Sequence, residues 1–204
     1  MFKYNHINNK INSIDGGIIM DIFECIKTKR SVRNYEDKCI SHQDMDKLIE
    51  LGTMASTGSG MEPWGFVVIN DKEEINQWSE KIKAHLLENM DDFPYLIQYK
   101  SWLENPKYSV FNHTNTLLII YGDKNSHWRS YDCSLAAGNI MLAAHEMGIG
   151  TCWIGFAEYM LNTDEFKQKY NIPKNFELIC PMSIGYMKKR LTEPKRKKPT
   201  IFFR

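Results

Sequence analysis

Several features that mark large classes of protein are scarce or absent in this sequence. Its 204 residues carry a formal net charge of only +1, which argues against broad electrostatic binding to nucleic acid or to an anionic membrane. No apolar run approaches the ~20 residues that a helix needs to span a bilayer. Residues 1–19 are polar and rich in asparagine, so no signal peptide is predicted. We therefore expect a cytoplasmic protein without nucleic-acid or membrane partners.

The cysteines exclude further classes by their number and spacing. None of the five forms a Cys-x-x-Cys pair, and none has a histidine at metal-ligand spacing. Most lie in apolar segments, where cysteine acts as a small core residue. An odd number without a secretion signal fits a reducing compartment. We predict no structural metal, no iron–sulfur cluster and no disulfide.

No familiar set of catalytic side chains is visible either. The histidines are scattered and complete no Ser-His-Asp or Cys-His arrangement. No Gly-x-Gly-x-x-Gly segment follows a predicted strand, so a Rossmann site for a nicotinamide cofactor is not expected. A protein nucleophile or an obligatory side-chain base can therefore not be assigned from these patterns.

What is present is typical of an ordinary globular domain. The chain is 43% hydrophobic and 25% charged, and it shows no internal repeat and no domain linker. Residues 1–19 lack periodicity and end near the turn signal Asp15-Gly16-Gly17, so we interpret them as an N-terminal extension. Met20 is then a candidate first residue of the natural chain, and residues 20–204 form one domain.

Hydrophobic periodicity within that domain predicts alternating helices and strands. Short helices are expected after Asp21, after Ser41 and over 162–170. A polar-rich helical stretch covers 71–105 and is broken at Asp91–Pro94, and a long amphipathic helix covers 130–147. In this helix an apolar stripe is expected from Leu135, Ala136, Asn139, Ile140, Ala143 and Met147. Buried strands are expected at 64–69, 116–121, within 148–155 and at 176–186.

Two basic runs carry the candidate binding chemistry. Arg30, Ser31 and Arg33 place two guanidinium groups and a hydroxyl within four residues, and such groups bind phosphate oxygens. The alternative is that these cations merely follow a helix C-terminus, where positive charge is favoured. The second run, Lys195–Lys198, equally fits a solvated tail. By its chemistry the first run is a candidate phosphate clamp.

Four blocks of the chain, in order, resemble the nitroreductase family of flavin mononucleotide (FMN) enzymes. The first is Arg30–Tyr35, similar to the family's Arg-Ser-x-Arg loop. The second is Ala55–Trp64, similar to its Pro-Ser-x-x-Asn-x-Gln-Pro-Trp loop. The third is Asp132–Gly155, similar to its central helix and Gly-x-Gly-x-x-Trp segment. The fourth combines Ile184–Tyr186 with Lys195–Pro199. The order of these blocks, taken from Met20 onward, extends over about nine-tenths of the chain.

This resemblance implies an α+β fold with a mostly antiparallel central sheet flanked by helices. It also implies a homodimer with two FMN sites at the interface and a C-terminal arm that reaches across the partner. The apolar tail Thr200–Phe203 fits that arm, because it would be poorly soluble if left free. The small residues of the 130–147 helix fit a subunit contact.

The resemblance further implies roles for particular residues around FMN. Arg30, Ser31 and Arg33 would hold the phosphate and ribityl end, and Lys195 and Lys197 would complete the phosphate site. Ser56, Thr57 and the position of Gly60 would approach the flavin from the other subunit. Trp153, Ile154 and Gly155 would lie beside the isoalloxazine, with a backbone N–H near Gly155 directed at flavin N5.

The chain departs from the family pattern in the second block. Gly60 replaces the family asparagine, Glu62 replaces the glutamine, and Ala55 replaces a proline. By this resemblance, loss of the asparagine amide would remove a hydrogen bond to the pyrimidine edge of the flavin. Four of the aromatic residues of 91–112, namely Tyr95, Tyr99, Trp102 and Tyr108, either cover a pocket as a lid or pack against the core.

The function that the resemblance implies is FMN-dependent oxidation of NAD(P)H. Hydride would pass through flavin N5 to a nitroaromatic, a quinone or a similar electron-poor acceptor, in ping-pong turnover within one pocket. One alternative is a specialised flavin enzyme of the same fold, dehalogenase-like or flavin-consuming. Another is a flavin-binding or storage protein without turnover.

Overall fold

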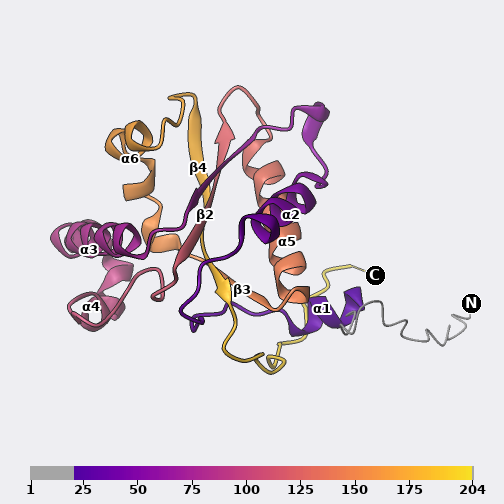
Figure 1. Cartoon of the computed structure of the whole chain (residues 1–204), viewed down its shortest axis with the longest axis horizontal. Helices are drawn as coiled ribbons and strands as arrows, with labels where there is room; N and C mark the ends of the chain where they lie inside the picture. Colours follow the sequence, from indigo (N-terminus) through magenta and orange to yellow (C-terminus); the bar gives the residue numbers. More distant parts are fainter. Residues whose placement is uncertain (1–20, 204) are drawn as a thin grey trace, which may run out of the picture.

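The protein is an α+β structure built on one antiparallel sheet (Figure 1). The computed structural model describes residues 21–203, and the expected extension over residues 1–19 lies outside that range. The four strands are ordered β1-β2-β4-β3. They are β1 (Trp64–Ile69), β2 (Thr116–Asp123), β3 (Ile149–Trp153) and β4 (Phe176–Tyr186). The predicted fold class is thereby confirmed.

The central strand β2 divides the interior into two cores. Leu117, Ile119 and Tyr121 point into one core, which also contains Ile75, Trp78 and Ile82. Leu118 and Ile120 point into the other core, together with Leu48 and Ile140. Because alternate residues of a strand face opposite sides of the sheet, a strand covered on both faces must be apolar throughout. This explains the unbroken run of aliphatic residues in β2.

Helices cover both faces of the sheet (Figure 1). One face is covered by α2 (His42–Thr53) and α5 (Arg129–Glu146), with the short α1 (Ile22–Thr28) beside α5. The other face is covered by α3 (Lys72–Glu88), α4 (Lys100–Leu103) and α6 (Asp164–Lys169). Short 3-10 turns occupy 58–60, 90–92, 94–99, 155–157 and 160–162. No helix within residues 21–203 is long and apolar enough to cross a bilayer.

The helix boundaries follow local signals in the sequence. The side chains of Asp21, Ser41 and Thr163 accept hydrogen bonds from the first turns of α1, α2 and α6, as N-caps do. Within the predicted helical stretch 71–105, the long helix α3 ends at Glu88. Short 3-10 turns and the four-residue helix α4 follow it. Leu135, predicted on the apolar stripe of α5, is instead 52% exposed. The buried face of α5 is centred on Cys133, Ala137 and Ile140, which leaves Leu135 at its margin.

The basic loop after α1 is docked on the β3–β4 edge of the sheet. The backbone N–H of Val32 donates to the carbonyl of Thr151 at 2.9 Å. The buried Tyr35 donates its hydroxyl to the carbonyl of Val32 at 2.6 Å. Beneath the loop, Gly150 and Gly185 are paired in register. A Cβ on Gly150 would lie 2.6 Å from Val32, and one on Gly185 would lie 2.8 Å from Tyr35. The two glycines therefore provide the space that the loop needs.

This close packing gives a direct test of the loop's docking. Replacing Gly150 with alanine should destabilise the protein by about 1–3 kcal/mol, because the added methyl group overlaps Val32 and the paired strands resist movement. Urea unfolding measures the effect. The matched control is Gly138→Ala in α5, where a Cβ meets nothing within 4 Å and alanine favours the helix. Equal stability of the two variants would contradict the docking described here.

Candidate functional site

A cavity of about 550 Å³ opens at the end of β3 and is the first candidate site. This volume suits a small-molecule ligand. Most of its wall is aromatic or aliphatic, and Arg33 is the one charged side chain among the residues that line it. The lining consists of Arg33, Tyr99, Trp102, Tyr108, Val110, Asn112, Cys152, Trp153, Ile154, Gly155 and Phe156.

Three parts of the fold build this cavity. The docked loop supplies Arg33, and the end of β3 with the following turn supplies residues 152–156. The segment between α3 and β2 supplies the remaining residues, including Tyr99 and Trp102. Their rings lie 5.5 Å apart, and Tyr99 also contacts Phe156 edge-on at 5.1 Å. Such ring arrangements form a wall against which a flat molecule can pack.

Arg33 sets the electrostatics of the cavity. Burial raises the pKa of the Cys152 thiol, and the nearby Arg33 charge acts in the opposite direction. Burial likewise raises the pKa of Tyr108, again opposed by Arg33. Both groups are therefore neutral near pH 7, and the cavity wall carries a single positive charge. A ligand with electron-rich or anionic atoms is favoured beside Arg33.

A second cavity of about 260 Å³ adjoins the first, because Arg33 lines both. Its wall contains Ser31 from the docked loop and two cations, Lys188 and Lys189, from the segment after β4. The wall is completed by Val32, Asn34 and Leu191. Three cationic side chains with a hydroxyl are a set of donors that binds phosphate.

The predicted clamp residues are brought together only in part. Arg30 lines neither cavity. Its Nε donates to the carbonyl of Thr192 at 2.9 Å, and Nη1 donates to the carbonyl of Lys27 at 2.9 Å. Arg30 thereby joins the end of α1 to the C-terminal segment, while its buried Nη2 has no hydrogen-bond partner among residues 21–203. Lys195 and Lys197 follow Thr192 closely, but both are exposed and line neither cavity.

The other predicted site residues divide into two groups. Trp153, Ile154 and Gly155 line the large cavity together with Arg33. Ser56, Thr57 and Gly60 line neither cavity of this chain. Their loop is tied to α5 instead, since the backbone N–H of Gly58 donates to Oδ1 of Asp132 at 3.0 Å. In a single chain the second group is therefore separate from the cavity.

The structure adds residues that sequence reasoning missed. Lys188 and Lys189 were not singled out, although their basic run directly follows the predicted strand 176–186. Phe156 and Asn112 were missed because nothing local distinguishes them. Of the four aromatic residues considered for a lid, the structure places Tyr99, Trp102 and Tyr108 along the cavity. Tyr95 instead packs against Phe93 and is 59% exposed.

The fold and the two adjoining cavities define a class of protein. An aromatic cavity beside a basic one fits a flat ring system that carries a phosphate group, as in nucleotide-type redox cofactors. Comparison with known proteins identifies the class more narrowly. The chain belongs to the nitroreductase family, whose model matches residues 26–186. Members of this family are FMN-dependent oxidoreductases, so the chain is an oxidoreductase.

Three similar proteins illustrate the match. An Archaeoglobus fulgidus protein named "Putative NADH dehydrogenase/NAD(P)H nitroreductase" is 29% identical over 169 residues, which are 81% of this chain and 86% of that protein. A Bacteroides fragilis nitroreductase crystallised with bound FMN has a TM-score of 0.76 and 27% identity, covering 90% of this chain and 98% of that one. An iodotyrosine deiodinase of Thermotoga neapolitana is 21% identical over 185 residues, covering 87% and 92%.

Proposed function

We propose that this chain binds FMN in the two adjoining cavities and oxidises NAD(P)H at the expense of a nitroaromatic, quinone or similar electron-poor acceptor. The observation that carries the proposal is the position of Arg33 between an aromatic cavity and a basic one. The Bacteroides fragilis relative supports it, because that protein was crystallised with FMN. The chemistry that FMN supplies when bound is hydride transfer in two halves, from a reduced nicotinamide and then to the acceptor.

The larger cavity suits the isoalloxazine. Its aromatic wall offers flat contacts, and Gly155 leaves open space, since a Cβ there would meet nothing within 4 Å. In the proposed complex Trp153, Ile154 and Gly155 lie beside the ring, and a backbone N–H at Gly155 is the assigned donor to flavin N5. NAD(P)H and the acceptor use the same cavity in turn, which gives ping-pong kinetics.

The smaller cavity suits the phosphate end of the cofactor. A phosphate taken out of water needs positive charge and hydrogen-bond donors around it. Ser31 and Arg33 lie there, joined by Lys188 and Lys189. We keep Arg30, Lys195 and Lys197 in the proposed phosphate site. Arg30 holds the C-terminal segment beside the loop through Thr192, and this places the two lysines three and five residues further along the chain.

A flavin-binding protein without turnover is the second candidate function. The observation that favours it is the loop before β1, where Gly60 and Glu62 replace the amide side chains of the family pattern. Both residues have positive φ, 63° for Gly60 and 46° for Glu62. A changed loop of this kind alters contacts with the flavin without removing the cavity.

A spectrum of the purified protein with reductant separates the two candidates. We expect flavin absorbance near 450 nm that bleaches within seconds on addition of NADPH or NADH and returns when a nitroaromatic or a quinone is added. Bound flavin that no nicotinamide bleaches would support the storage protein. A colourless protein that takes up no added FMN would contradict both.

Arg33 is the residue whose loss should weaken FMN binding most directly. Arg33→Ala removes a charge-assisted contact, so we expect FMN affinity to fall by about 2 kcal/mol, roughly 30-fold in Kd. Quenching of flavin fluorescence during titration of the apoprotein measures it. The conservative Arg33→Lys should retain part of the affinity. Unchanged affinity in Arg33→Ala would exclude Arg33 from the site.

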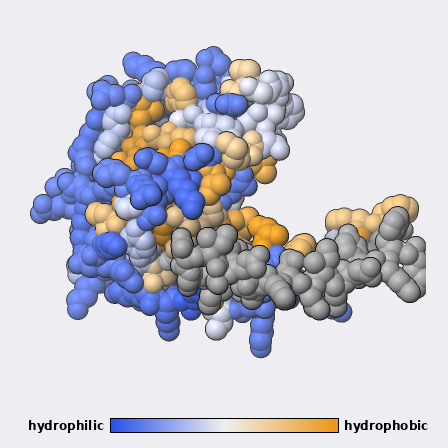
Figure 2. Space-filling model, turned by 45° about the vertical axis from the view of Figure 1, so that its right-hand side comes forward, coloured by the Kyte–Doolittle hydropathy of each residue, from blue (hydrophilic) through white to orange (hydrophobic). Residues whose placement is uncertain are grey.

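The predicted homodimer remains part of the proposal, because residues 21–203 leave two apolar surfaces uncovered. Figure 2 turns the side of α2 and α5 toward the viewer and shows apolar residues there within polar margins. A groove of about 380 Å³ lies between α1, α2 and α5, with Ile22, Leu51, Met54 and Leu142 on its walls. Phe202 and Phe203 in the tail are 98% and 93% exposed. A second copy of this chain is the occupant that we propose for both surfaces, bringing its Ser56–Gly60 loop to the cavity.

Removal of the tail tests this assembly. Sedimentation should give about twice the chain mass of 23.9 kDa for the full protein. Deletion of residues 200–204 removes the exposed apolar arm and should weaken the dimer. We expect the dissociation constant of the dimer to rise by about tenfold or more. A Phe202→Ser and Phe203→Ser double variant controls for chain length. A full-length protein that sediments as a monomer would contradict the proposal.

A further inference from the structure

One segment contributes five residues to the wall of the large cavity. These residues are Tyr99, Trp102, Tyr108, Val110 and Asn112, and we call the segment 99–112 the strap. The ring of Trp102 lies 6.1 Å from the ring of Tyr108, and Trp102 is 54% exposed. The strap therefore forms an outer aromatic wall whose position depends on how its backbone is held.

The backbone at Tyr108 is shaped by a tight turn that begins at Asn105. The N–H of Tyr108 donates to the carbonyl of Asn105 at 3.0 Å. The side-chain Oδ1 of Asn105 accepts the N–H of Lys107 at 2.9 Å. Both bonds end on Asn105, so any group that fixes this residue also fixes the direction in which Tyr108 leaves the turn.

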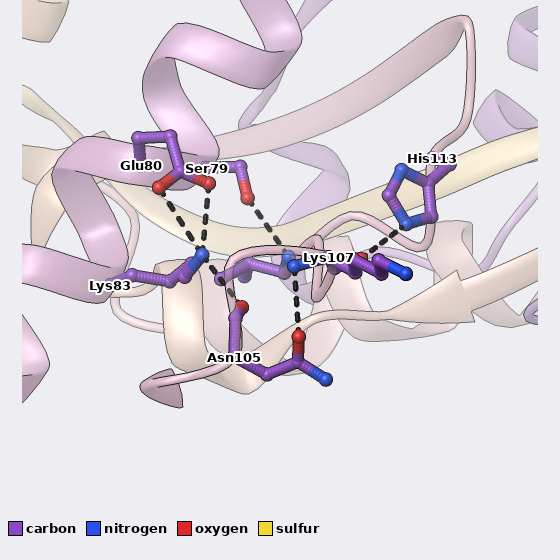
Figure 3. A network of polar contacts seen from close by, with 7 residues as sticks. Ser79, Glu80, Lys83, Asn105, Lys107 and His113 are labelled. Atoms are coloured by element: carbon purple, nitrogen blue, oxygen red, sulfur yellow. Dashed lines mark hydrogen bonds and ion pairs between the residues drawn. The ribbon is translucent and has the colours of Figure 1, made fainter. Parts of the chain in front are cut away.

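Lys83 of α3 donates a hydrogen bond to that same carbonyl, as Figure 3 shows. Its Nζ donates to the carbonyl of Asn105 at 3.2 Å and to the carboxylate of Glu80 at 3.0 and 3.2 Å. Lys83 is only 5% exposed. Lysine is rarely buried unless it is paired, and an apolar side chain in its place is often no less stable. The specific contribution of this ammonium group is therefore to position the Asn105 carbonyl.

Two further contacts fix the strap on either side of Tyr108 (Figure 3). Ser79, one turn earlier in α3, accepts the backbone N–H of Val110 at 2.9 Å. The ring nitrogen Nε2 of His113 bonds the carbonyl of Lys107 at 3.0 Å. The backbone around Tyr108 is thus held at positions 105, 107 and 110. The backbone from which the Tyr108 ring projects is therefore ordered before a ligand arrives.

We propose that Lys83 is a positioning residue that sets how tightly the site binds aromatic acceptors, by presenting Tyr108 in a fixed orientation. The inference rests on the proposed function and adds a determinant of acceptor binding to it. A ring that is already ordered loses less freedom when a flat molecule packs against it. A stacking contact of this kind changes affinity between about twofold and tenfold.

The test compares two acceptors in the FMN-loaded protein. One is a quinone, which must enter the cavity, and the other is ferricyanide, a small inorganic acceptor that needs no aromatic contact. In Lys83→Met the KM for the quinone should rise about fivefold while kcat stays within twofold. The ferricyanide rate should not change. Lys81→Met is the matched control, because Lys81 lies on the same helix and its side chain is 49% exposed.

Two more variants keep the result interpretable. Lys83→Arg retains a donor for the Asn105 carbonyl, so it should restore most of the quinone KM. Ser79→Ala removes the acceptor for Val110 and should shift the quinone KM in the same direction, which also serves if Lys83→Met does not fold. Equal losses with both acceptors, or no change in any variant, would overturn the inference. Failure of NAD(P)H to reduce the wild-type flavin would instead refute the proposed function.

Discussion

The site depends on one close backbone contact, between the loop 31–36 and the outer side of β3. Val32 adds a hydrogen bond to Thr151 on the side of β3 that β4 leaves unpaired, so the loop covers a sheet edge that would otherwise expose its backbone groups. Gly150 and Gly185 permit this approach. Arg33 follows in the loop, and Trp153 and Gly155 follow in the chain after β3. Docking therefore fixes where the guanidinium group lies relative to the cavity wall.

The two faces of the sheet then take different roles. The cavity lies against the core that β2 shares with α3, since Cys152 and Ile154 belong to that cluster. The opposite core, between the sheet and the helices α2 and α5, is filled from the helix side by residues such as Leu48 and Ile140. Its outer helices still expose apolar side chains around the groove at Leu51 and Met54. One face thus holds a ligand cavity, and the other presents a surface suited to another protein chain.

Local patterns predicted the elements well because each element carries its own signal. Ser41 caps α2, and aliphatic runs mark the buried strands. The site was predicted less completely because it depends on which segments meet. Lys188 and Lys189 meet Arg33 only through sheet pairing, and Lys83 becomes buried only because the strap lies over α3. In sequence Lys83 is one more cation on a polar helix. Leu135 was wrongly predicted to lie on the buried stripe of α5 for a similar reason. The sheet covers a narrower face of this helix than the spacing of its apolar residues indicates.

The cations around the smaller cavity differ in how accessible they are to a ligand. Arg30 donates most of its hydrogen bonds to backbone carbonyls of Lys27, Lys29 and Thr192. Its guanidinium therefore mainly links α1 to the C-terminal segment. Its remaining nitrogen, Nη2, is buried and finds no hydrogen-bond partner within the part of the chain that the structure describes. An unmet charged donor at such a place costs free energy that an anion would recover. Arg33 and the lysines, by contrast, lie where a ligand can reach them. In the proposed site one arginine therefore assembles the basic surroundings, and the other faces the ligand.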